Sequence, residues 1–225
     1  MIKAFTLIEL LVVIAVIAIL AALVIPVSGA VNAARTKRRA MAELAQVETA
    51  IERYKAKLGH YPPDNPRNPV LNQLYYELLG TTLSNNAYTT LDGSTNLPQA
   101  LLGGAGGAFG PDVAGFVNSS KGGGGDDGST ASSFINGLKP AQIGTISVKR
   151  AYLVRLLVSV PWQQGPPPFN FDPVPGAPTL NPWRYNYSAP TNNPNSFDLW
   201  LDVIIGAKAY RICNWSKQPL RINTP

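Results

Sequence analysis

The chain has 225 residues, of which 45% are hydrophobic and only 14% are charged. That length suffices for one domain, or for one domain with an appendage. One cysteine and one histidine exclude an intramolecular disulfide and a Cys/His zinc cluster, which needs about four ligands. The formal net charge is +6. The first 58 residues contain eight basic and four acidic side chains and so carry +4 of that charge. A nucleic-acid partner is therefore not expected for the C-terminal part.

Near the N-terminus lies an apolar run, residues 10–27, that contains no charged or polar side chain. As a helix rising about 1.5 Å per residue it would be roughly 27 Å long, close to the hydrocarbon thickness of a bilayer. We therefore predict a transmembrane or filament-core helix over residues 5–27. Glu9 lies at its entrance. A carboxylate inside a membrane segment costs about 2.5–3.5 kcal/mol on insertion scales, and such residues are usually functional. This carboxylate needs a cation, and no Lys or Arg of the chain lies one helical turn away.

Residues 4–14, AFTLIELLVVI, resemble the prepilin-type cleavage and methylation signal of type IV pilins and type II secretion pseudopilins. The resemblance implies that prepilin peptidase removes a leader, residues 1–4, by cutting between Ala4 and Phe5 on the cytoplasmic face. It implies that Phe5 is then N-methylated, and that Glu9 pairs with the Phe5 amine of the adjacent subunit to set the register of a helical filament. Ala4 departs from the family, which usually has Gly before the cut.

Two observations keep alternatives open. The segment Ser28-Gly29-Ala30 fits the small-x-small cleavage site of an ordinary secretory signal peptide, but the apolar run exceeds the usual length of about 7–15 residues. Four basic residues within 35–39 follow the run, and the positive-inside rule alone would place the C-terminal part in the cytoplasm. The resemblance implies the opposite topology, with a cytoplasmic leader and a periplasmic head, and we follow it.

Residues 28–59 predict an amphipathic helix that continues the apolar one into the head. They are rich in good helix formers, and their apolar residues recur at spacings of three and four on one face: Leu44, Val47, Ile51, Tyr54 and Leu58. Gly59 predicts the C-terminal end of the helix, and Pro62-Pro63 prevents its continuation. Pro26 falls where many pilins loosen their long helix, and we expect a weak point there.

The remaining residues, 60–225, are expected to form a globular head. Within it we predict a short helix over 72–79 and an irregular insertion over 103–128, which holds eleven of the twenty glycines. That glycine run does not predict a phosphate-binding loop, because it is not followed by Lys-Ser or Lys-Thr. Apolar spacing over 149–160 favours a helix, although its valine content permits a strand.

The C-terminal part carries a second resemblance. Residues 181–187, NPWRYNY, and 196–200, SFDLW, are similar to a pattern of the major pseudopilins. Alternating apolar residues predict a small antiparallel sheet over 181–215, packed on the amphipathic face of the long helix. The predicted fold class is therefore α+β and pilin-like.

In the major pseudopilins a calcium ion lies in the loop after this pattern. Asp198 matches the pattern, but Leu201-Asp202-Val203 stands where the family has a Gly-Ala-Asp-Gly-type loop. We expect no cofactor, with calcium at Asp198 and Asp202 as the alternative that the resemblance raises.

The chain is not expected to be an enzyme, because it shows no Ser/His/Asp arrangement and no carboxylate pair in a predicted pocket. The resemblance implies a structural subunit of a type II secretion pseudopilus or a type IV pilus-like filament. It would be held in the bacterial inner membrane by a single span and polymerised through its hydrophobic helix. The expected partners are further copies of the chain, prepilin peptidase, an inner-membrane assembly platform and minor pseudopilins.

A second class of function is an exported or membrane-anchored protein that binds a surface glycan. Aromatic residues of the head could stack on sugar rings, and they motivate this alternative: Trp162, Trp183, Tyr185, Tyr187 and Trp200.

Overall fold

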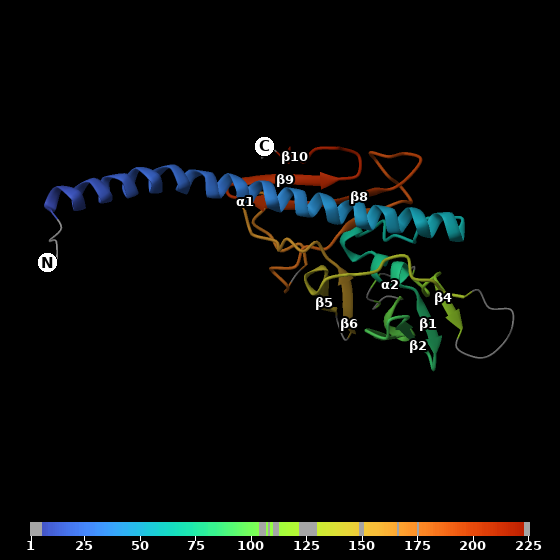
Figure 1. The fold of residues 1–225 in the computed structure, drawn as a ribbon. Helices are drawn as coiled ribbons and strands as arrows, with labels where there is room; N and C mark the ends of the chain where they lie inside the picture. Colours follow the sequence, from blue (N-terminus) through green and yellow to red (C-terminus); the bar gives the residue numbers. More distant parts are fainter. Residues whose placement is uncertain are drawn as a thin grey trace. The chain divides into compact units, whose positions relative to one another are not determined.

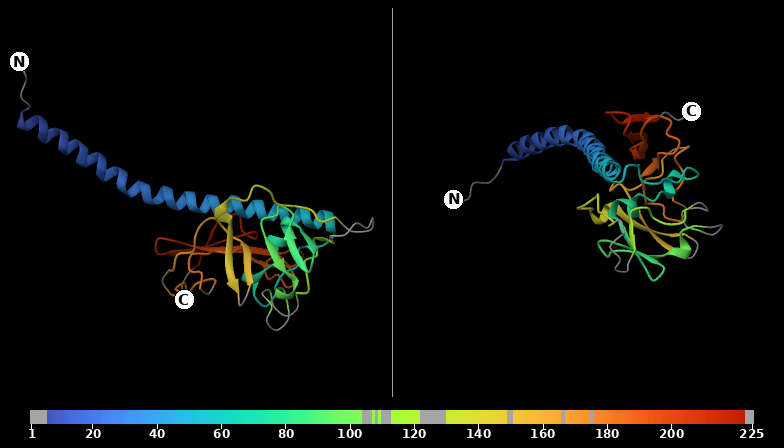
Figure 2. Two further views of the ribbon diagram at one scale, coloured as in Figure 1. Left: turned by 90° about the horizontal axis from the view of Figure 1, so that it is seen from below. Right: turned by 90° about the vertical axis from the view of Figure 1, so that its right-hand side faces the viewer.

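The computed structural model divides the chain into two units, Met1–Arg39 and Ala40–Pro225 (Figure 1). It describes residues 6–103, 107, 109, 113–121, 130–148, 151–165, 167–174 and 176–222, without the side chains of 23–28, 148 and 151. The second unit contains the predicted head, residues 60–225, together with the C-terminal part of the long helix. The strands of the head form separate groups, coloured green, yellow and red in Figure 2. Among the described residues, short 3-10 helices lie in its connections: Pro69–Leu71, Gln99–Leu101 and Pro140–Gln142.

The long helix is confirmed as α1, Leu7–Leu58. It ends where predicted, because Gly59 adopts a left-handed backbone with φ of +83° and its N–H donates to the carbonyl of Lys55 at 2.8 Å. The predicted weak point at Pro26 lies among residues whose side chains are outside the described part, and it stays a prediction. In the described residues, no helix combines the length and hydropathy that a bilayer crossing requires, so the predicted transmembrane half is not confirmed.

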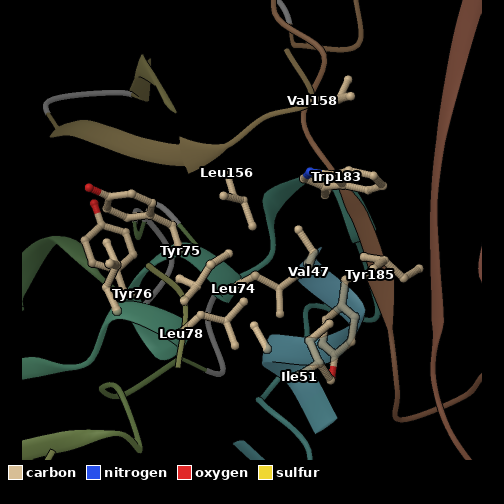
Figure 3. Packing of buried hydrophobic residues seen from close by; sticks show 14 of the residues in the cluster. Val47, Ile51, Leu74, Tyr75, Tyr76, Leu78, Leu156, Val158, Trp183 and Tyr185 are labelled. Atoms are coloured by element: carbon tan, nitrogen blue, oxygen red, sulfur yellow. The ribbon is translucent and has the colours of Figure 1, made fainter. Parts of the chain in front are cut away.

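The C-terminal part of α1 supplies one face of the head's hydrophobic core. Leu44, Val47, Ile51 and Tyr54 are buried as their spacing predicted. They cluster with α2, Leu74–Leu79, and with aromatic residues near the C-terminus (Figure 3). Full burial of one large apolar side chain contributes roughly 1.5–3 kcal/mol, which is why this face holds the head together.

The predicted C-terminal sheet is confirmed as four antiparallel strands in the order β10-β9-β8-β7. The strands are β7, Arg184–Asn186; β8, Asp198–Ile205; β9, Lys208–Cys213; and β10, Leu220–Ile222. Strand β10 was not predicted. Side chains at alternate positions of β8 are completely buried: Leu199, Leu201 and Val203.

The described part of the head contains two further sheets. One has the order β3-β2-β1-β4 and comprises β1, Thr81–Ser84; β2, Ala87–Thr90; β3, Asn96–Pro98; and β4, Ser119–Lys121. The other pairs β5, Ile143–Val148, with β6, Ala151–Leu156. Strands β1 and β2 form a hairpin through Asn85 and Asn86, both at positive φ, as such two-residue turns require.

The structure differs from the sequence expectations in two segments of the head. The helix favoured over residues 149–160 is wrong, because Ala151–Leu156 is a strand that pairs antiparallel with β5 over six residue pairs. The insertion over residues 103–128 is not wholly separate from the core. Phe116 and Phe109 are buried, and the Phe116 ring stacks on Tyr76 with centroids 4.6 Å apart. Other parts of that insertion lie outside the described residues.

A buried carboxylate on α2 ties three segments of the head together. Glu77 is completely buried and accepts a hydrogen bond from the Tyr54 hydroxyl at 2.9 Å. The backbone N–H groups of Val117 and Asn118 donate to the same carboxylate at 2.8 and 2.9 Å. Burial raises the pKa of Glu77, and it also raises the pKa of Tyr54, whose hydroxyl therefore stays protonated and donates.

Replacing Glu77 by Gln should destabilise the head by about 1–3 kcal/mol at pH 5, because an amide NH2 would then face a backbone N–H donor. An unfolded chain loses the proton of a Glu side chain at a pKa of about 4.3. Because the pKa of Glu77 is raised in the folded state, the folded chain keeps this proton to higher pH. The stability that this group contributes is present below the unfolded pKa and is lost as pH rises through the folded pKa. The difference in unfolding free energy between the native chain and Glu77→Gln should therefore shrink with rising pH.

Urea unfolding of the full chain in detergent, followed by tryptophan fluorescence between pH 5 and pH 9, measures that difference. Glu52→Gln changes an exposed carboxylate on α1 and serves as the control, with an expected effect within about 0.5 kcal/mol. A difference that grows with pH would contradict the assigned direction.

Candidate processing and assembly site

The first turn of α1 is capped by Thr6 and Glu9. The Oε2 atom of Glu9 accepts hydrogen bonds from the N–H of Thr6 at 2.8 Å and from its hydroxyl at 2.7 Å. The hydroxyl oxygen of Thr6 in turn accepts a bond from the N–H of Glu9 at 3.3 Å. This reciprocal pair is a capping box, which satisfies two N–H groups that the helix itself cannot.

The helix that follows the cap exposes apolar side chains on all sides. Every Leu, Ile and Val between Leu7 and Leu20 is exposed, from 47% for Val13 to 81% for Leu7. A helix that is apolar all round is one that becomes buried, in a core or in lipid. An exposed apolar surface of this extent marks an interaction or membrane surface.

The predicted processing residues, Ala4 and Phe5, lie outside the described residues, so their roles stay predictions. Glu9 is described, and its contacts add a role that the sequence reasoning missed, the capping of its own helix through Thr6. A signal for that role was present in the sequence, because Ser/Thr-x-x-Glu before an apolar run is the pattern of a capping box.

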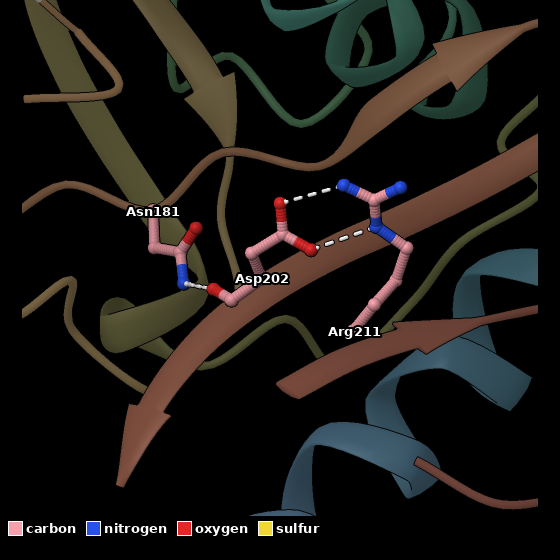
Figure 4. Close-up of polar contacts among 3 residues, drawn as sticks. All are labelled: Asn181, Asp202 and Arg211. Atoms are coloured by element: carbon pink, nitrogen blue, oxygen red, sulfur yellow. Dashed lines mark hydrogen bonds and ion pairs between the residues drawn. The ribbon is translucent and has the colours of Figure 1, made fainter. Parts of the chain in front are cut away.

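The two aspartates considered for calcium lie on β8, and each is engaged by other donors. The carboxylate of Asp198 accepts N–H groups from residues 191–193. The carboxylate of Asp202 binds Arg211 through two bonds of 2.9 and 3.1 Å, and the backbone carbonyl of Asp202 accepts a bond from Asn181 (Figure 4). Calcium prefers oxygen ligands, so this set of donors does not fit the ion. Within the described residues, no group of three or more His, Cys, Asp or Glu could hold a metal.

The aromatic residues considered for glycan binding are mostly part of the core. Trp183 and Tyr185 have no exposed surface, and Trp162 is 3% exposed. Of the set, Tyr187 and Trp200 are half-buried. Because a stacking platform must be accessible, burial removes three of the five residues that motivated this alternative.

Replacing Thr6 by Val should remove the hydroxyl from the cap and expose the N–H of Glu9 to solvent. Amide hydrogen exchange at Glu9, measured by NMR in detergent micelles, should become several-fold faster. The matched control is Thr6→Ser, which keeps the hydroxyl and should keep the protection. Equal exchange rates in the Val and Ser variants would show that the cap is not formed in solution.

Comparison with known proteins bears on the N-terminal segment. Residues 1–25 match the family model of the prokaryotic N-terminal methylation motif. No curated protein and no solved structure matches the chain, so the pilin-like part of the fold prediction is not confirmed. The motif supports a pilin-like or pseudopilin precursor that prepilin peptidase processes, and it indicates a structural subunit with a membrane or exported location. Residues 1–25 thus carry the prepilin-type signal of type IV pilins and pseudopilins.

Proposed function

We propose that the chain is a structural subunit of a type II secretion pseudopilus or a type IV pilus-like filament. Prepilin peptidase would cut between Ala4 and Phe5, and the processed chain would polymerise through its hydrophobic helix. The strongest support is that two features coincide in one segment. Residues 1–25 match the methylation motif, and the helix from Leu7 to Leu20 exposes apolar side chains.

The energetics favour burial of that surface in an assembly. Each Leu, Ile or Val that becomes fully buried contributes roughly 1.5–3 kcal/mol, and the exposed residues surround the helix. Lipid would cover them while the subunit is stored in the bacterial inner membrane, with the leader cytoplasmic and the head periplasmic. In the filament, the helices of neighbouring copies would replace the lipid.

Glu9 would set the register between copies. Both hydrogen bonds from Thr6 fall on Oε2 of Glu9, and no described residue donates to Oε1. The Oε1 atom can therefore accept the methylated amine of Phe5 from an adjacent subunit while the cap stays intact. An amine that pairs with this carboxylate also lowers the cost of burying its charge.

A pseudopilus is preferred to a pilus because the C-terminal pattern around Trp183 and Asp198 resembles the major pseudopilins. The single cysteine, Cys213, also excludes an intramolecular disulfide that would brace the head, as in many pilins. The expected partners are further copies, an inner-membrane assembly platform and minor pseudopilins.

The N-terminus of the native protein distinguishes the two possible processing routes. Intact mass and N-terminal sequencing of protein isolated from membranes should give a chain that starts at methylated Phe5. A start at Val31 would instead mean conventional signal-peptide removal, and the filament proposal would be abandoned.

Replacing Glu9 by Ala should strongly reduce the fraction of protein in sedimentable filaments, because the amine of the adjacent copy loses its carboxylate. The amount of membrane-held protein should be unchanged, since the apolar helix is intact. Asp172→Ala, which removes a carboxylate from the head, is the control and should assemble normally. Filaments from the Glu9 variant in native amount would refute the proposed register role.

A further inference from the structure

The loop between β7 and β8, residues 187–197, is organised by the carboxylate of Asp198. Its Oδ2 accepts hydrogen bonds of 2.9 Å from the N–H groups of Thr191 and Asn192 and from the side-chain Nδ2 of Asn192. Its Oδ1 accepts a fourth, also of 2.9 Å, from the N–H of Asn193. Three successive backbone N–H groups therefore converge on one carboxylate, as in an anion-binding nest. Asp198 is only 3% exposed, so these bonds are little weakened by solvent.

A second carboxylate holds the beginning of the same loop. Asp64, in the linker after α1, accepts hydrogen bonds at Oδ2 from the N–H groups of Tyr187 and Ser188 at 3.0 and 3.1 Å. The hydroxyl of Ser188 donates to the same oxygen at 2.9 Å. Asp64 thereby joins the linker to the end of β7 through N–H and O–H donors.

Two amide side chains close the loop onto the sheet. Asn193 donates from Nδ2 to the carbonyl of Phe197 at 3.0 Å and to Oδ1 of Asn214 at 3.2 Å. Asn214 donates from its own Nδ2 to the carbonyl of Phe197 at 2.9 Å, and its Oδ1 accepts the N–H of Leu199 at 3.0 Å. The loop is therefore fastened at its start, middle and end by groups of the protein itself.

This arrangement disagrees with the calcium that the resemblance to major pseudopilins implies near this segment. Calcium takes roughly six to eight oxygen ligands, whereas the groups that point at Asp198 are N–H donors. A cation on this carboxylate would face the positive ends of those N–H dipoles and would have to displace them. Asp202, four residues further along, is already paired with the guanidinium of Arg211.

We propose that the β7–β8 loop is a calcium-independent scaffold, in which Asp198 and Asp64 bind backbone N–H groups and so hold the loop without a cation. The head then keeps its fold when calcium is removed. The consequence that filament formation does not respond to calcium rests on the proposed function, whereas the scaffold itself does not.

Thermal unfolding of the full chain in detergent, with millimolar calcium or with EGTA, tests the scaffold directly. The two melting temperatures should agree within about 1 °C, whereas calcium at about 100 times its dissociation constant would raise Tm by roughly 5–10 °C. A rise of that size that EGTA abolishes would overturn the proposal.

The variant Asp198→Asn tests the role of the carboxylate, because an isosteric amide places NH2 donors against N–H donors. Its Tm should fall by roughly 5–10 °C, while Asp172→Asn, in which a less buried carboxylate bonds to Gln164, should shift Tm by about 1 °C or less. An unchanged Tm in Asp198→Asn would refute the scaffold.

If Asp198→Asn yields no folded protein, Asn192→Ala removes a single donor to the same carboxylate. Its Tm should fall by roughly 2–4 °C, and no change would count against the proposal. These melting experiments involve neither processing nor assembly. Their failure is therefore distinct from failure of the filament proposal, which the mass of the native N-terminus decides.

Discussion

Burial of one face of α1 between Ala40 and Tyr54 is the constraint on which the head is built. The side chains that cover this face come from α2 and from the C-terminal strands. A single cysteine cannot form a disulfide within the chain, so apolar packing and buried polar contacts must hold these segments together. The buried hydrogen bond from Tyr54 to Glu77 is directional, unlike apolar packing, and it fixes α2 relative to the end of α1.

Several loops of the head are held in position by carboxylate side chains that lie on helices and strands. Glu43 on α1 accepts the N–H of Ser159 at 2.8 Å, Glu77 on α2 accepts the two N–H groups at 117–118, and Asp198 on β8 accepts three more. A buried carboxylate without partners would cost several kcal/mol, so each acid requires the loop to present its N–H groups. The loops in turn gain a defined position that their Gly- and Pro-rich sequences do not encode locally.

Features encoded by neighbouring residues were predictable from sequence. The end of α1 at Gly59 needed only a glycine after a periodic helix, and the C-terminal strands followed from alternation and from the turn at Gly206. The methylation motif is likewise a contiguous pattern, and so is the Thr6-x-x-Glu9 spacing of the helix cap.

Features that depend on distant partners were not predictable in this way. Residues 151–156 carry an ambiguous apolar spacing, and their pairing with β5 decides in favour of a strand. Glu77 looks like an ordinary surface acid in a short helix, because Tyr54 lies 23 residues before it and Asn118 lies 41 residues after it. The donors around Asp198 come from a loop whose composition resembles any turn. Sequence alone therefore could not show that they occupy the carboxylate.

The hydrogen bond from the hydroxyl of Tyr185 to the carbonyl of Pro62 joins segments that are 123 residues apart, so it forms only after the later segment has been synthesised. Strands β8 and β9 follow α1 in the chain only after α2 and β1 to β7, so they leave the ribosome well after α1. At about 5–20 residues per second, the apolar face of α1 waits on the order of ten seconds for them. Packing against α1 is therefore completed late, and a nascent chain that stops before β8 lacks the part of the cover that Leu199, Leu201 and Val203 supply.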